Sequence, residues 1–214
     1  MNVRLLIAAA SVVAVAAWLL KKHLWRAILY FFPTSVTVEE DAPAHAKLRL
    51  PDALIAPAAE LERLGLVFIG THLEQPKLRP AILSFDYASG EAGAFVSLFV
   101  NDAGEARAEL FTPMASGGFV RTANYRRSAL ELPGYFSGYL ENVPLGRVLH
   151  AHRRRVTALG APAPAWDVNA RVAATRAWYQ SLGAGRELRQ QHANGLMWTF
   201  GAFVIGGVGL VTLL

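Results

Sequence analysis

The pattern of apolar and polar positions divides the chain into two apolar ends and a mixed middle. The segment Gly195–Leu214 contains no charged residue. Twenty helical residues rise about 30 Å, which matches the hydrocarbon core of a bilayer. A helix that is apolar on all sides at this length is typical of a membrane span. We therefore predict a C-terminal transmembrane helix over 195–214.

A second apolar stretch, Leu5–Leu20, lies near the other end of the chain. It is short for a membrane span, but aromatic residues of the kind that collects at membrane boundaries follow it. These observations predict an N-terminal anchor over residues 1–33. The alternative is a signal peptide cleaved after the A-x-A site at 14–16. Lysines soon after that site oppose translocation, which favours the anchor.

Positive charges beside the apolar stretches predict the orientation of the chain. Lys21, Lys22 and Arg26 follow the first stretch, and Arg186 and Arg189 precede the second. Cytoplasmic flanks of membrane helices are enriched in lysine and arginine. We therefore predict two spans in a cell inner membrane with the middle of the chain facing the cytoplasm. Cleavage of a signal peptide would instead place that middle domain outside.

The middle of the chain begins with strand-like patterns. Apolar runs and residues that alternate with a period of two are separated by turn signals. Since no connection has room for a crossover helix, we predict an antiparallel meander of four or five strands. Residues 128–144 are expected to be irregular because they mix aromatic residues with proline and glycine. The predicted strands are Leu66–Leu73, Ala81–Tyr87, Ala94–Val100, Ala106–Phe111 and Phe119–Ala123.

Helical spacing appears before and after these strands. A short helix is predicted over 58–64, with Pro57 at its start and Gly65 just beyond its end. A second is predicted over Leu145–Leu159. A third begins after Asp167, a suitable N-cap. Its predicted apolar stripe consists of Val168, Val172, Tyr179 and Leu182. Gly183 and Gly185 are predicted to end it.

Together these elements predict an α+β fold. A short helix precedes an antiparallel sheet, two helices follow it, and two transmembrane helices flank the whole. The predicted segments are an anchor (1–33), a linker or edge segment (34–56), an α+β domain (57–185), a basic juxtamembrane segment (186–194) and a transmembrane helix (195–214).

Composition and charge exclude several function classes. The chain has no cysteine, which rules out disulfides, thiolate metal sites and a cysteine nucleophile. Its net charge is +5, but residues 34–115 carry 6 basic and 12 acidic groups, whereas residues 116–194 carry 11 basic and 4 acidic groups. We predict no nucleic-acid partner, because such a partner needs a concentrated basic face. Opposite charges favour two halves that attract each other within one fold. The alternative is a basic surface near lipid headgroups.

Catalytic motifs are absent from the sequence. It contains no G-x-S-x-G elbow, phosphate loop or H-E-x-x-H pair, so we predict no catalytic residue, metal or cofactor. His150 and His152 are two positions apart on a predicted helix and point in different directions. His152 lies in the apolar stripe, as a core histidine does. The alternative is a ligand-binding or general-base role for His152 together with His72 or Asp86.

Two further groups are candidates for binding. Tyr135 and Tyr139 flank an aromatic segment that lines a pocket or caps the sheet. The run HAHRRR at 150–155 is the densest basic cluster, yet adjacent residues fan around a helix, as on a solvated face. The alternative is contact with the membrane surface or a partner through Arg153, Arg154, Arg186 and Arg189.

Three hypotheses for function follow. The first is a non-enzymatic accessory or scaffold subunit, anchored in the lipid bilayer and bound to other membrane-protein subunits. The second is a membrane-tethered binder of lipid or a small apolar ligand. The third is a hydrolase-type enzyme. The many alanine and arginine residues are typical of a bacterial genome rich in G and C, a feature that does not indicate a function.

Overall fold

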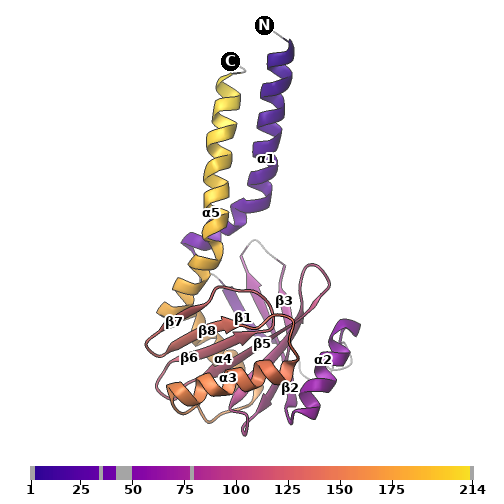
Figure 1. Cartoon of the computed structure of the whole chain (residues 1–214), viewed down its shortest axis with the longest axis vertical. Helices are drawn as coiled ribbons and strands as arrows, with labels where there is room; N and C mark the ends of the chain where they lie inside the picture. Colours follow the sequence, from indigo (N-terminus) through magenta and orange to yellow (C-terminus); the bar gives the residue numbers. More distant parts are fainter. Residues whose placement is uncertain (1–2, 34–35, 42–49, 78–79, 213–214) are drawn as a thin grey trace. The chain divides into compact units, whose positions relative to one another are not determined.

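The computed structural model describes residues 3–33, 36–41, 50–77 and 80–212. This part of the chain has an α+β fold with five helices and one eight-stranded sheet (Figure 1). The chain divides into two compact units. One contains helix α1 (Val3–Phe31) and helix α5 (Leu182–Val211) from Leu188 onwards. The other, Val36–Glu187, contains the sheet, and we call it the sheet domain.

The sheet confirms the predicted class but corrects the predicted number of strands, which is eight and not four or five. The strand order is β1-β2-β3-β4-β5-β6-β8-β7. Neighbouring strands are antiparallel except β6 and β8, which pair in parallel. The strands are β1 (Val36–Asp41), β2 (Val67–Pro76), β3 (Ile82–Ser89), β4 (Ala94–Val100), β5 (Ala106–Pro113), β6 (Phe119–Ala123), β7 (Leu130–Leu132) and β8 (Tyr135–Tyr139).

The three additional strands lie at the two ends of the sheet: β1 forms one edge, β7 forms the other, and β8 lies just inside β7. Strand β1 falls in the segment predicted as a linker or edge, of which residues 34–35 and 42–49 lie outside the described ranges. Strands β7 and β8 fall in the segment predicted to be irregular. Gly134, with a φ of 72°, makes the turn between them. Gly138 lies within β8, where a Cβ would meet the ring of Phe136 at 2.9 Å. Gly134 and Gly138 were part of the reason for predicting irregular structure, but in the fold they make a turn and a close contact that strand β8 requires.

One face of the sheet carries the apolar core. Helix α2 (Asp52–Arg63) and helix α3 (Leu145–Leu159) cover this face. The predicted bounds of α3 are confirmed, whereas α2 begins earlier than predicted and contains Pro57. Every second residue of the central strands points into this core. Its most completely buried side chains are Leu54, Leu61, Phe85, Tyr87, Val96, Leu98, Leu110 and Val148.

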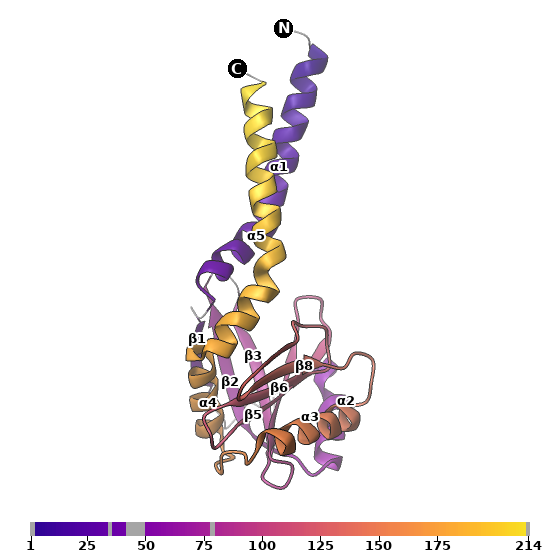
Figure 2. The same cartoon turned by 60° about the vertical axis from the view of Figure 1, so that its left-hand side comes forward.

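Helix α4 (Val168–Gln180) lies on the opposite face of the sheet (Figure 2). Asp167 caps it as predicted, since its Oδ1 accepts a hydrogen bond from the N–H of Ala170 at 2.7 Å. The predicted apolar stripe is wrong in part, because Leu182 is 85% exposed. The helix buries a mainly polar face because the sheet opposite it is polar. Its buried residues are Arg171, Val172, Thr175 and Trp178.

Helix α5 corrects two predicted boundaries. Gly183 and Gly185 were predicted to end the preceding helix but lie in the first turn of α5. Residues 186–194, predicted as a separate basic segment, are helical and continue without a break into the apolar stretch. The helix reaches Val211, and the last two residues of the predicted span, 213–214, lie outside the described part of the chain.

Within the first unit, α1 and α5 pack against each other through small residues. A Cβ built on Gly206 would lie 3.1 Å from the Cβ of Ala16, and one on Gly209 would lie 3.0 Å from Val12. These contacts pair later residues of one helix with earlier residues of the other, so the helices are antiparallel. Small contact residues allow such close packing.

The outward surface of this helix pair is strongly apolar. Ile7 and Trp18 on α1 are 62% and 58% exposed, and Phe200 and Phe203 on α5 are 69% and 60% exposed. Within the described residues, α1 and α5 are the two helices long and apolar enough to cross a membrane. This agrees with the predicted pair of apolar segments.

Candidate functional site

A row of polar side chains crosses the sheet on the face that α4 covers. Asp86 pairs with Ser97 across β3 and β4, and Ser97 pairs with Glu109 across β4 and β5, so the three side chains share one face. His72 on β2 and Arg121 on β6 extend this row, and all five residues are buried. We call the following set the polar layer: His72, Glu74, Asp86, Ser97, Glu109, Arg121, Arg127, Arg171 and Glu187.

The structure brings the candidates His72 and Asp86 together at one end of this layer. Nδ1 of His72 lies 2.5 Å from Oδ2 of Asp86. Ser97 donates its hydroxyl proton to Oδ1 of Asp86 at 2.5 Å and accepts a hydrogen bond from Nη2 of Arg171 at 3.0 Å. The Ser97 hydroxyl therefore faces a carboxylate and a guanidinium, and it does not contact the imidazole that would activate a nucleophile.

The surroundings of His72 favour its charged form. Burial lowers the pKa of His72, but the charge and hydrogen bond of Asp86, helped by Glu74, outweigh this and raise the pKa to about 9. The protonated ring donates to both carboxylates, with Oε1 of Glu74 at 3.3 Å. Burial also raises the pKa of Glu74, but hydrogen bonds from His72 and Tyr179 bring this pKa below its usual value. His72 is thus a buried cation at neutral pH.

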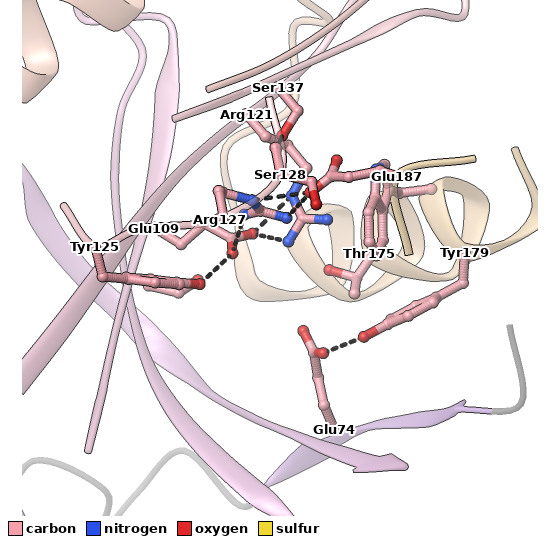
Figure 3. A network of polar contacts seen from close by, with 12 residues as sticks. Glu74, Glu109, Arg121, Tyr125, Arg127, Ser128, Ser137, Thr175, Tyr179 and Glu187 are labelled. Carbon is pink, nitrogen blue, oxygen red and sulfur yellow. Dashed lines mark hydrogen bonds and ion pairs between the residues drawn. The ribbon is translucent and has the colours of Figure 1, made fainter. Parts of the chain in front are cut away.

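Glu109 is the centre of the other end of the layer (Figure 3). Its carboxylate accepts hydrogen bonds from Nε of Arg121 at 2.8 Å, Nη1 of Arg127 at 2.7 Å and the hydroxyl of Tyr125 at 3.1 Å. Nε of Arg127 also donates to Oε1 of Glu187 at 2.8 Å. Burial raises the pKa of Glu109, but Arg121 and Arg127 hold the pKa far below its usual range.

Glu187 connects the second turn of α5 to the sheet. Its second carboxylate oxygen accepts a hydrogen bond from the hydroxyl of Tyr135 on β8. The same hydroxyl accepts a hydrogen bond from Nε1 of Trp178 on α4 at 3.0 Å. The guanidinium of Arg121 lies 3.5 Å from the centroid of the Trp178 ring, a cation–π contact. The layer therefore fixes α4 and the start of α5, up to Glu187, to one face of the sheet.

The charges of the polar layer balance. With His72 protonated, the layer contains four cations and four carboxylates. Removal of one partner from a buried ion pair is costly, whereas a complete and hydrogen-bonded set compensates for much of the lost hydration. Each ionisable group therefore has an oppositely charged partner, as in a structural network, although Nη1 of Arg121 is buried without a hydrogen-bond partner. The cations are His72, Arg121, Arg127 and Arg171, and the carboxylates are Glu74, Asp86, Glu109 and Glu187.

The third candidate, His152, lies on the opposite face of the sheet from His72 and Asp86. Thr112 donates its proton to the carbonyl oxygen of Gly93 at 2.7 Å, so the nearby Nε2 of His152 must donate to Oγ1 of Thr112, at 2.8 Å. Nδ1 then accepts from the hydroxyl of Thr122 at 3.0 Å. Burial lowers the pKa of His152 to about 3. This neutral, hydrogen-bonded ring has the geometry of a core histidine.

The two candidate tyrosines have different surroundings. Tyr135 is buried, and its hydroxyl belongs to the hydrogen-bond network of Glu187. Tyr139 is 37% exposed and borders an open hollow of about 410 Å³ together with Phe136. Strand β8 is therefore buried at its first residue, Tyr135, and exposed at its last residue, Tyr139.

The four candidate arginines are exposed on two helices. Arg153 and Arg154 lie on α3 and line a groove beside α2. Arg186 lies in the first turns of α5 within the sheet domain, and Arg189 belongs to the other unit. Arg155, in contrast, turns toward Phe136, and its guanidinium lies 4.4 Å from that ring.

Most members of the polar layer were not singled out in the sequence. Glu109 alternates with apolar residues, as a solvent-facing strand residue does. The arginines have partners far away in the sequence, such as Glu187 for Arg127, which is 60 positions later. One available signal was the opposite charge of the two halves. Glu74, Asp86 and Glu109 belong to the acidic half, and three arginines of the layer belong to the basic half.

The raised pKa of His72 predicts a loss of stability in alkali. The contribution of His72 is fully present below its unfolded-state pKa of 6.5 and is lost as the pH rises through about 9. The slope in this window is about 1.4 kcal/mol for each pH unit. We expect the thermal midpoint of the full chain in mild detergent to fall from pH 6.5 to pH 9. The variant His72→Gln should have a lower midpoint at pH 6 and lack most of this slope.

The exposed His150 provides the control for this experiment. His150→Gln removes a histidine of the same chain without touching the polar layer, so it should keep the wild-type slope. An unchanged slope in His72→Gln would contradict the assignment of a buried, charged imidazole.

Comparison with known proteins gives this chain no relative. No protein-family model, curated protein or solved structure matches it. Across the described residues, no group of three or more histidine, aspartate or glutamate side chains is arranged to hold a metal ion.

Proposed function

We propose that the chain is a membrane-anchored accessory or scaffold subunit. In this proposal α1 and α5 span the inner membrane, and the sheet domain lies on the cytoplasmic side, where it contacts other membrane-protein subunits. The observation that carries the proposal is the outward surface of the helix pair. Its contact surface includes small residues such as Ala16 and Gly206, while large apolar side chains such as Phe200 and Phe203 are exposed. Exposed apolar area on this scale is unfavourable in water and suits lipid.

The polar layer supports a scaffold over a hydrolase. His72, Asp86 and Ser97 are buried, and their hydrogen-bonding groups are engaged within the polar layer, including with Glu74 and Arg171. The second alternative, a binder of an apolar ligand between the sheet and α3, has less support. Val148 and Leu149 of α3 are buried in the core and fill this interface.

The orientation is tested with a reporter inserted at residue 103. The turn at Asn101–Gly104 suits an insertion because it is exposed and hydrogen-bonded within itself. Oδ1 of Asn101 accepts from the N–H groups of Ala103 and Glu105 at 3.0 and 2.9 Å. Reporter activity is expected on the cytoplasmic side. Activity on the external side would overturn the proposed orientation and favour a cleaved N-terminal segment.

The scaffold role is tested by the mass of the native particle. A tag in the same turn allows purification in a mild detergent, followed by size-exclusion chromatography with light scattering. We expect a protein mass well above the 23.2 kDa of one chain, with a second protein at fixed stoichiometry. The same tag on an unrelated two-span protein identifies proteins that co-purify because they bind the tag itself. A single chain alone in its micelle would refute the scaffold role.

A further inference from the structure

A groove of about 620 Å³ lies between the end of α2 and one side of α3. Leu64, which follows α2, and Leu149 form an apolar part of its lining. His150, Arg153 and Arg154 supply basic groups from α3. None of the residues that line the groove is acidic. The groove therefore offers an apolar contact and two permanent positive charges within one small space.

The spacing of α3 explains which arginines reach the groove. Residues three and four positions apart share one side of a helix, which places Arg153 and Arg154 beside His150 and Leu149. Arg155 points away, toward Phe136 and Glu131. The expectation that the three consecutive arginines would fan apart therefore holds for Arg155, whereas the other two share a surface.

The charges in the groove are not balanced. Helix α3 carries four arginines and no acidic residue. Arg155 lies 3.8 Å from Glu131, but among the described residues neither Arg153 nor Arg154 has an ion-pair partner. Neighbouring cations on a helix repel one another, so an anionic group bound here would relieve that repulsion. This contrasts with the polar layer, in which every charge has a partner.

We propose that this groove docks an acidic segment of a partner protein. Carboxylates of that segment pair with Arg153 and Arg154, and an apolar side chain covers Leu64 and Leu149. The guanidinium group suits this role because it binds carboxylates with two parallel hydrogen bonds. The assignment rests on the proposed scaffold function and adds to it the chemistry of one partner.

The lining of the groove favours a protein segment over lipid headgroups. Helices α2 and α3 cover one face of the sheet, and α4 with the start of α5 covers the other (Figure 2). A groove lined by Leu64 and Leu149 as well as by arginines suits an apolar side chain flanked by carboxylates, whereas lipid headgroups are polar throughout.

The test uses a labelled acidic peptide and the full chain in a neutral detergent. The probe is a fluorescein-labelled peptide of sequence DELLEDEL, followed by fluorescence anisotropy at about 50 mM salt, where screening of exposed charges is modest. We expect saturable binding that weakens at least tenfold in R153E/R154E and by a smaller factor in R153Q/R154Q. A matched peptide with serine in place of each leucine should bind more weakly, because the apolar floor loses its contact.

A matched charge reversal separates the groove from net charge. The variant K77E/R126E changes two exposed cations outside the groove and should bind the peptide as the wild type does. Equal weakening in both double variants, or no weakening in R153E/R154E, would overturn the assignment. Displacement of the peptide by phosphatidylglycerol in mixed micelles, with the same dependence on Arg153 and Arg154, would overturn the proposal and show that the groove binds lipid headgroups.

The outcomes for the groove and for the scaffold role are distinguishable. If the purified particle contains a partner but peptide binding is unchanged in R153E/R154E, the groove assignment alone fails. If the peptide binds through the arginines but the native particle is a single chain, the scaffold role fails and the basic groove remains a binding site.

Discussion

Replacement of Glu109 by glutamine is expected to lower the free energy of unfolding by about 3–5 kcal/mol. The Glu109 carboxylate accepts hydrogen bonds from Arg121, Arg127 and Tyr125. An amide has nearly the same shape but no charge, so it leaves two buried guanidinium groups without their shared counter-charge. Chemical denaturation of the full chain in mild detergent, followed by tryptophan fluorescence, measures the effect. Trp178 is a useful reporter because it stacks against Arg121.

Glu105→Gln is the matched control, because it makes the same chemical change four residues away, just after the turn at Asn101–Gly104. Glu105 pairs with Arg107 at the surface, where its side chain is 57% exposed. Exposed ion pairs contribute about 0–1 kcal/mol. A loss in Glu109→Gln that is no larger than the loss in Glu105→Gln would contradict the structural role of the polar layer.

Replacement of Gly183 by alanine is expected to destabilise the sheet domain by about 1–3 kcal/mol, the usual cost of overpacking. A Cβ at Gly183 would overlap the ring of Tyr135, with Cγ at 2.6 Å. The ring has little freedom to move, because the Tyr135 hydroxyl is held by Glu187 and Trp178. The same denaturation experiment measures the change.

The comparison with Gly185 isolates the steric effect. Gly185 lies on the same helical turn, but a Cβ there meets no atom within 4 Å. Gly185→Ala should stabilise the chain by up to about 1 kcal/mol, because alanine is the better helix former. If both substitutions changed stability by the same amount and sign, close packing of α5 against Tyr135 would be excluded.

Sequence reasoning predicted correctly those elements whose hydrophobic periodicity agrees with the face that they bury in the fold. Strands β4 and β6 and helix α3 have the predicted bounds, because their periodicity and flanking turn residues agree. Strand β8 was missed because Gly138 and the nearby proline predict irregular structure. There the absent Cβ makes room for Phe136. Its parallel pairing with β6 depends on β7 lying outside it, which no local pattern reveals.

The candidate site was predicted less completely than the fold. His72 and Asp86 were candidates only as partners of His152, so their pairing with each other was not predicted. Arg171 and Thr175 occupy the buried side of α4, yet a search for an apolar stripe excludes such residues. Hydrophobic periodicity identifies the face of a helix that meets an apolar core. It fails for a helix that covers a charged sheet, because burial there depends on partners distant in the sequence.

The two faces of the sheet become complete at different stages of synthesis. The apolar face needs only residues up to the end of α3, so it can close once Leu159 has left the ribosome. The polar layer joins residues that are far apart along the chain: Arg171 is 74 positions after Ser97, and Glu187 is 60 positions after Arg127. Until α4 and the first two turns of α5 emerge, Glu109 and its arginines must stay hydrated. The domain therefore finishes folding just as the second apolar helix is being made.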